Sequence, residues 1–190
     1  MTQGSLFTAS TPLPGFTYEE GVLTPEDEAA AIAGIAALEL KEMRYKEFTA
    51  KRRVASFGAG YDFDANEPTP APRLAGFLLP LRDRVATWAG EDPEDFGYAL
   101  VAEYQPGTPL GWHRDVPEYE TILGVSLGTA CTMRLRHYPP QKRERIFTME
   151  LAPRSAYVIR DEARWEWQHA IAPTPGLRYS VTFRSRRVLG

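Results

Sequence analysis

Apolar residues recur with helical spacing in two stretches of the first half of the chain. The first stretch opens at Thr24, where a hydroxyl cap is followed by proline and acidic residues, and it continues to about residue 40. The second covers residues 74–88, and Gly90 is well placed to end it. The pattern therefore predicts two N-terminal helices, preceded by an irregular arm over residues 1–20.

Strand-forming residues dominate the rest of the chain. Residues 44–66 intersperse aromatic and aliphatic side chains with glycines, which is typical of short strands and a hairpin-like turn. Residues 66–72 contain three prolines and predict a loop. Further strands are expected at residues 98–104, 121–127, 131–137, 145–151, 155–160, 168–172 and 178–185. Two helices followed by short strands predict an α+β fold whose β part is a sandwich or jelly roll.

The composition fits one domain. With 190 residues, of which 43% are hydrophobic, the chain is long enough to bury one substantial core. The single cysteine, Cys131, excludes an internal disulfide framework and is expected to be a buried structural thiol in a reducing compartment. Neither a secretory signal nor an apolar run of membrane-spanning length is visible. We therefore expect a cytoplasmic monomer without membrane contact.

The net charge of −3 argues against strong, non-specific binding of nucleic acid. The charge is unevenly spread, however, because basic residues collect in residues 51–53, 134–145 and 184–187. A local basic face is therefore compatible with the acidic total.

Candidate metal ligands come from two of the three histidines. His113 and Asp115 are two residues apart, so on an extended backbone both side chains project from the same face. One carboxylate and two imidazoles form the facial triad that holds non-haem Fe(II). His169, on a predicted strand, is the expected second imidazole, whereas His137 is expected at an exposed strand end. An H-x-D pattern alone also occurs by chance, so further support is needed.

The last predicted strand, RYSVTFR at residues 178–184, places two arginines on one face. Arg178, Ser180, Thr182 and Arg184 share that face, and Tyr179, Val181 and Phe183 share the other. An ordinary solvated surface strand shows the same alternation. Two arginines side by side nevertheless suit a dicarboxylate, since the planar guanidinium matches a carboxylate and stays charged.

Taken together, these motifs resemble the AlkB family of Fe(II)- and 2-oxoglutarate-dependent dioxygenases. The resemblance rests on H-x-D, the downstream histidine and R-x-x-x-x-x-R, with the flanking segments VAEYQPGTPLGWHRD and TILGVSLGTACTMRLR. It implies one domain over residues 1–190, with a double-stranded β-helix (jelly roll) core at 98–187 and the two N-terminal helices packed on one sheet. RRVASFGAGYDF, within residues 44–66, is similar to the family's substrate lid.

The resemblance also implies roles for individual residues. His113, Asp115 and His169 would bind Fe(II). Tyr104, Arg178, Ser180 and Arg184 would form the 2-oxoglutarate site, with Arg178 on the far carboxylate. The chain departs from the family at Ala102 and Ser180, where an asparagine is frequent.

The implied reaction is oxidative demethylation of an N-alkylated nucleic-acid base, with dioxygen as the oxidant. Phe57, Tyr61 and Phe63 are candidates for stacking on the base, and Arg52 and Arg53 for contacting phosphates. The alternative is that these aromatics pack within strands and that the arginines line a solvated edge.

Three further points stay open at this level. Arg134, Arg136 and Arg143 either contact a nucleic-acid backbone or form a solvated strand face. Trp112, Trp165 and Trp167 suit a core or pocket wall better than a stacking platform. The same chemistry also suits a modified tRNA base, a protein side chain or a small molecule, and a jelly-roll binding module without catalysis is a further alternative.

Overall fold

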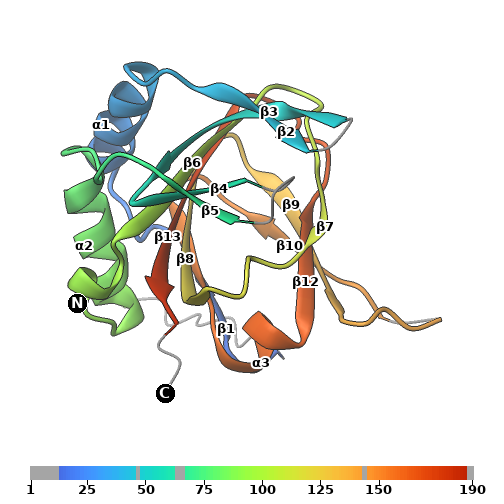
Figure 1. Cartoon of the computed structure of the whole chain (residues 1–190). Coiled ribbons are helices and arrows are strands. Elements are labelled where there is room, and N and C mark those ends of the chain that lie inside the picture. The colour runs from blue at the N-terminus through green and yellow to red at the C-terminus, as the bar shows by residue number, and fades with distance from the viewer. Residues whose placement is uncertain (1–12, 46–47, 63–66, 143–144, 188–190) are drawn as a thin grey trace, which may run out of the picture.

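Two β-sheets facing each other form the body of the protein, and two helices cover the outer face of the larger sheet (Figure 1). The computed structural model describes residues 13–45, 48–62, 67–142 and 145–187. None of the described helices has the length and apolarity needed to cross a membrane.

The described helices are α1 (Pro25–Ala36), α2 (Leu78–Ala89), α3 (Asp161–Trp165) and the 3-10 turn η1 (Pro93–Asp95). The first strands are β1 (Phe16–Glu19), β2 (Lys41–Tyr45), β3 (Phe48–Phe57), β4 (Ala59–Asp62) and β5 (Glu67–Pro70). They are followed by β6 (Tyr98–Tyr104), β7 (Leu110–His113), β8 (Tyr119–Gly128), β9 (Cys131–His137), β10 (Phe147–Leu151), β11 (Ser155–Ile159), β12 (Trp167–Ile171) and β13 (Arg178–Arg186).

The strand order confirms the predicted double-stranded β-helix. Among the described residues the larger sheet has the order β1-β11-β8-β13-β6-β3-β2, and the smaller sheet has the order β10-β9-β12-β7. From β6 onward the chain passes back and forth between the two sheets, and all the pairings are antiparallel. Strand β13 lies in the middle of the larger sheet, between β8 and β6. One of its faces points toward the helices, and the other points toward the smaller sheet.

The two faces of β13 have the division predicted from the sequence. Val181 and Phe183 are fully buried in the core between the larger sheet and helices α1 and α2. A second core lies between the sheets and contains Met133, Leu135 and Cys131, so the expectation of a buried thiol is confirmed. The predicted packing of both N-terminal helices on one sheet is confirmed as well (Figure 1).

The first helix begins as the sequence predicts and ends earlier. Thr24 accepts a hydrogen bond from the amide of Asp27, while the Asp27 carboxylate accepts one from the amide of Thr24, which completes a capping box. The helix ends at Ala36, not near residue 40, because β2 starts at Lys41 and pairs with β3. The second helix is four residues shorter at its start than the spacing indicates, and Gly90 ends it in a left-handed conformation as expected.

Several other expectations about local structure are wrong. Residues 16–19 are not part of an irregular arm: they form β1, whose backbone pairs with β11. Residues 67–70 are not a loop, because they form β5 and pair with β4, and a two-stranded ribbon has only edge strands, where proline is tolerated. Strand β7 and helix α3 have no counterpart among the predicted elements.

Candidate metal centre

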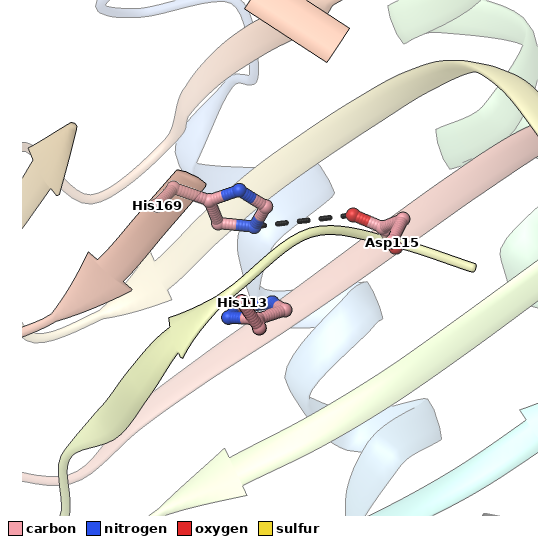
Figure 2. Close-up of side chains that lie close together, drawn as sticks. All are labelled: His113, Asp115 and His169. Atoms are coloured by element: carbon pink, nitrogen blue, oxygen red, sulfur yellow. Dashed lines mark ion pairs between the residues drawn. The ribbon is translucent and has the colours of Figure 1, made fainter. Parts of the chain in front are cut away.

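His113, Asp115 and His169 come together between the two sheets (Figure 2). His113 ends β7 and is paired directly with His169 on the neighbouring strand β12. Asp115 follows two residues later, just past the end of β7. One ligand atom from each of the three side chains lies within 4.8 Å of the other two, so the structure brings together all three predicted ligands.

The two imidazoles and the carboxylate face a common point. The ring centroids of His113 and His169 are 4.2 Å apart, and Nε2 of His169 lies 3.9 Å from Oδ2 of Asp115. Nδ1 of His113 lies 2.9 Å from the carbonyl oxygen of Gly111. Because a carbonyl only accepts, Nδ1 carries the proton, and Nε2 keeps its lone pair for a metal.

Arg184 fixes the orientation of the Asp115 carboxylate. Its Nε and Nη2 atoms both donate to Oδ1 of Asp115, each at 2.8 Å. Both side chains are largely buried, with exposed fractions of 13% for Arg184 and 8% for Asp115. With Oδ1 held in this way, Oδ2 is the oxygen that faces His169. Arg184 therefore acts on the centre through Asp115, at the position where the sequence places it.

Arg164 holds the loop that carries Asp115. This side chain, on α3, is 3% exposed. Its Nη2 atom donates to the backbone carbonyls of Asp115, Val116 and Tyr119 at 3.2, 2.7 and 2.9 Å. The sequence interpretation missed Arg164, and no local pattern identifies it, since its partners are main-chain atoms 45 to 49 residues away.

The protonation states of the three groups suit metal binding. Burial, together with the neighbouring His113, lowers the pKa of His169 to about 3. Burial also lowers the pKa of His113. For Asp115, burial works in the opposite direction, but Arg184, followed by the two histidines, outweighs it and holds the pKa well below its usual range. At neutral pH the centre therefore offers two neutral imidazoles and one carboxylate, the forms that bind metals.

This donor set fits a particular metal. Two imidazole nitrogens and one carboxylate oxygen, with the remaining positions open, form the 2-His-1-carboxylate arrangement of non-haem Fe(II) enzymes. The close approach of the three side chains and the ion pair behind Asp115 agree with that assignment.

A second buried cation, Arg178, lies on the same face of β13 as Arg184. Only 1% of Arg178 is exposed. Its Nε donates to Oγ of Ser126 at 3.2 Å, and its guanidinium lies 4.9 Å from the centre of the Tyr104 ring. Its Nη1 atom is buried and has no hydrogen-bond partner among the described residues. A buried guanidinium nitrogen without a partner is costly, and a carboxylate is the group that satisfies it best.

The other residues expected around the cosubstrate are close to Arg178 in the sheet. Tyr104 is opposite Arg178 in the register of β6 and β13, and Ser180 is opposite Ala102 on β6 and Ser126 on β8. Tyr104 and Ser180 are both buried. The structure thus places the predicted cosubstrate residues Tyr104, Arg178, Ser180 and Arg184 on one continuous surface inside the jelly roll.

Tyr157 is a further residue of this surface that sequence reasoning missed. Its side chain is buried, and burial raises the pKa of its hydroxyl, while the charge of Arg178 acts in the opposite direction. Gly124 lies opposite it on β8, and a Cβ atom at Gly124 would clash with the Tyr157 ring. The phenol therefore stays protonated beside the guanidinium and is available as a donor.

Two of the predicted substrate residues lie on the face of β3 that points away from the metal centre. Phe57 is 5% exposed and packs in the core beneath α1 and α2. Arg53 forms an ion pair with Glu103, with Nη2 2.7 Å and Nε 2.9 Å from Oε1. Both residues lie on the helix-side face of β3, because side chains alternate along a strand and this face packs against the helices. The prediction that Phe57 and Arg53 contact the substrate is therefore corrected.

Arg52 occupies the opposite face of β3 from Arg53. It shares that face with Val54, which is opposite Ala102 in the sheet, and its positive charge contributes to the lowered pKa of His113. The backbone of Tyr61 lies in β4, but its side chain falls outside the described part of the structure, and Phe63 lies outside the described residues altogether. Among the predicted substrate residues with described side chains, Arg52 alone is directed toward the centre.

The three tryptophans expected in a core or pocket wall lie in three different environments. Trp167 packs against the core between the sheets, as expected for a wall residue. Trp165 donates from Nε1 to Glu120 at 3.1 Å and lies against the guanidinium groups of Arg164 and Arg187. Trp112 lies on the outer face of the smaller sheet, since its neighbour His113 points inward.

Comparison with known proteins agrees with the geometry. Residues 20–184 match the family model of the 2OG-Fe(II) oxygenase superfamily. The solved structure of OsALKBH1 superimposes with a TM-score of 0.71 over 91% of this chain and 97% of that chain, at 13% identity. At this identity the superposition shows the fold alone.

Three curated relatives are similar in sequence. An uncharacterized protein, L905 of Acanthamoeba polyphaga mimivirus, is 34% identical over 100 residues, or 45% of this chain and 46% of the relative. The alkylated DNA repair protein ALKBH8 homolog of Arabidopsis thaliana is 25% identical, over 88% of this chain and 53% of the relative. The tRNA (carboxymethyluridine(34)-5-O)-methyltransferase ALKBH8 of Mus musculus is 23% identical, over 84% of this chain and 24% of the relative. The chain thus spans about half the length of these relatives or less, and the resemblance to AlkB-like oxygenases is confirmed.

Removing the ion pair behind Asp115 is expected to weaken metal binding. In Arg184→Gln the Asp115 carboxylate loses both donors to Oδ1, so we expect the affinity for Co(II), an optical probe for Fe(II), to fall roughly 10- to 100-fold. Arg187→Gln is the matched control, because Arg187 pairs with the more exposed Glu120 at 3.5 Å. Titration followed by absorption spectroscopy measures both, and equal affinities in the two variants would contradict the role of Arg184.

The metal-free protein is expected to lose stability in mild acid. His169 has a pKa of about 3 in the folded chain and an ordinary value of 6.5, so between these values the unfolded chain binds the extra proton. The free energy of unfolding therefore has its full value above about pH 6.5 and decreases as the pH falls. At pH 5 the decrease is on the order of 2 kcal/mol. Burial of His113 acts in the same direction.

Urea unfolding in the presence of a chelator, at pH 7 and pH 5, measures this loss of stability. In His169→Asn the decrease between the two pH values should be smaller than in the parent. Parallel pH profiles for the two proteins would show that His169 does not cause the decrease.

Proposed function

Because this chain belongs to the 2OG-Fe(II) oxygenase superfamily, we propose that it removes N-linked alkyl groups from nucleic-acid bases by oxidation. Members of the superfamily are dioxygenases, so Fe(II), 2-oxoglutarate and dioxygen are the cofactor and cosubstrates of this chain. The observation that carries the proposal is the joint presence of the His113, Asp115 and His169 cluster and the buried, partly unsatisfied Arg178 on one interior surface. The names of two relatives, alkylated DNA repair protein ALKBH8 homolog and ALKBH8, support the substrate class.

His113, Asp115 and His169 would hold the iron. When bound, Fe(II) with 2-oxoglutarate supplies the activation of dioxygen that allows a substrate C–H bond to be oxidised. An N-methyl group hydroxylated at carbon then leaves as formaldehyde, and the unmodified base remains. The proposal requires no general base in the protein, which agrees with a site built from metal ligands and arginines.

The remaining residues position the reactants. Arg184 keeps one carboxylate oxygen of Asp115 engaged, so that the other is directed toward the metal position. Arg178 would pair with the far carboxylate of 2-oxoglutarate, with Tyr104 and Tyr157 close to the same end. His169 and Arg178 are deeply buried, and this burial limits the access of water to the reacting groups.

A modified tRNA base is the second candidate substrate. One relative is named as a tRNA methyltransferase, and this chain aligns with only 24% of it. The net charge of −3 also favours a structured RNA, or a short exposed strand, over tight binding along a duplex.

Mass spectrometry of a substrate panel tests the proposed function. N-methylated DNA and RNA oligonucleotides and bulk tRNA are incubated with the protein, Fe(II), ascorbate and 2-oxoglutarate. Loss of a methyl mass that requires 2-oxoglutarate is the expected result, and the ranking within the panel names the substrate. Asp115→Ala is the control: it should fold and lack turnover, and retained activity would remove Asp115 from the triad. Succinate formed without any change in a nucleic acid would overturn the proposed substrate class.

Shortening Arg178 is expected to raise the requirement for 2-oxoglutarate. A hydrogen bond to a charged group contributes about 1.5–3 kcal/mol, so the KM for 2-oxoglutarate should rise by roughly ten- to a hundredfold in Arg178→Gln. Since Arg178 is buried, circular dichroism must first show that the variant folds, and Ser126→Ala, which removes only the partner of Nε, should have the smaller effect. An unchanged KM in a folded Arg178→Gln protein would mean that the dicarboxylate is held elsewhere.

The two neighbouring arginines of β3 provide a matched test of the substrate face. Arg52 is directed toward the metal centre, whereas Arg53 pairs with Glu103 on the opposite face. We expect Arg52→Ala to raise the KM for the nucleic-acid substrate several-fold and Arg53→Ala to leave it within about twofold, because the Arg53 side chain lies on the face of β3 that points away from the metal centre. Steady-state assays with the best substrate of the panel compare them, and equal effects would argue against a contact from Arg52.

A further inference from the structure

The outer face of the smaller sheet carries a group of arginines and aromatic residues outside the metal centre. His113, His169 and Leu135 are paired across β7, β12 and β9 and point inward, so the residues beside them in sequence point outward. On β9 these are Arg134 and Arg136, and on β7 Trp112. Next to β7, Arg114 reaches the Tyr138 ring at the end of β9. We call these five residues the arginine–tryptophan face: Trp112, Arg114, Arg134, Arg136 and Tyr138.

The guanidinium groups of this face are stacked on the aromatic rings. Arg136 lies 4.3 Å and Arg134 5.3 Å from the centre of the Trp112 ring, and Arg114 lies 3.9 Å from the centre of the Tyr138 ring. Arg136 also donates from Nε to Gln168, and Arg114 donates from Nη1 to the carbonyl of Trp165. These contacts hold the arginines in place and leave their positive charge uncompensated by a carboxylate.

Seven other described arginines have a carboxylate partner. Arg53, Arg82, Arg84, Arg154, Arg160, Arg184 and Arg187 each form an ion pair. By contrast, Arg114, Arg134 and Arg136 form no ion pair with a described residue, and Nε of Arg134 is buried without a hydrogen-bond partner there. Two acidic residues lie near this face: Glu150, on the neighbouring strand β10, is opposite Thr132, and Glu166, just before β12, pairs with His137 at 3.4 Å. In a chain of net charge −3, this face is therefore a local concentration of uncompensated positive charge.

The position of the face connects it with the metal centre. Strand β7 is the edge strand of the smaller sheet, and His113 on its inner face is the immediate neighbour of Trp112 and Arg114. Arg114 is itself the residue between two of the predicted metal ligands. The arginine–tryptophan face and the metal centre are thus separated by the thickness of one strand at the open edge of the sheet.

We propose that the arginine–tryptophan face binds the phosphate backbone of single-stranded nucleic acid, next to the nucleotide whose base enters the metal centre. This inference rests on the proposed function and adds to it a binding surface and the kind of strand that occupies it. Arginines match phosphate geometry, and aromatic rings between them are typical of surfaces that bind single strands. Arg134 and Arg136 lie on β9 and Arg114 follows β7, with only β12 between these strands, so the three arginines span a short distance across the sheet. They can contact only a few phosphates, which suits a short strand better than a long duplex.

Oligonucleotide binding to a pair of double variants tests the inference. Arg134→Gln with Arg136→Gln removes two charges from the face, and Arg84→Gln with Arg154→Gln removes two ion-paired charges from the helix side of the molecule. The probe is a short, fluorescently labelled, unmethylated single strand, added to the full-length protein with Mn(II) and 2-oxoglutarate. Fluorescence anisotropy at several salt concentrations gives the affinity and its salt dependence, and melting temperatures show that the variants are folded.

The expected result is a loss of affinity of on the order of tenfold in R134Q/R136Q, with the slope of log affinity against log salt reduced by about 1.4, or 0.7 for each lost phosphate contact. The control R84Q/R154Q should bind as the parent does. Equal losses in the two double variants would show a general charge effect and overturn the proposal, as would parental affinity in R134Q/R136Q or tighter binding of a duplex than of the single strand. If demethylation by the parent protein is observed while R134Q/R136Q binds normally, the proposed function stands and only the binding surface is wrong.

Discussion

The ion pair between Arg184 and Asp115 connects the two sheets of the jelly roll at the point where the chemistry is located. Arg184 lies on the central strand of the larger sheet, while Asp115 follows the edge strand of the smaller sheet. Because both side chains are largely buried, loss of either partner would leave an uncompensated buried charge, which is costly. The direction in which Asp115 points, and with it the shape of the metal centre, depends on the two sheets keeping their relative position.

The alternation of side chains along β13 made much of this site predictable. One face of the strand holds Val181 and Phe183 against the helices, and the other holds Arg178 and Arg184 in the interior, as the two-residue period indicates. The H-x-D motif was equally informative, since its two side chains stay on one side of an extended segment. In both cases the spacing within a few residues determines the geometry, so the sequence contains the necessary information.

The sequence was less informative where the environment of a strand decides which face is functional. Phe57 and Arg52 both lie on β3 in a segment similar to the substrate lid, but only the packing of α1 and α2 determines which side is buried beneath the helices. Arg164 and Tyr157 could not be identified for a related reason. Their roles arise from contacts with residues distant in sequence, and neither residue belongs to a short motif.

The contacts of Arg164 have a consequence for how the segment from Asp115 to Tyr119 tolerates change. The guanidinium binds three carbonyl oxygens of the main chain and no side chain of that segment. Carbonyl oxygens are present whichever amino acid occupies a position, so substitutions at Val116, Pro117 or Glu118 leave this anchor intact. The side chains of this segment are therefore free to vary while Asp115, the metal ligand that precedes them, stays in place.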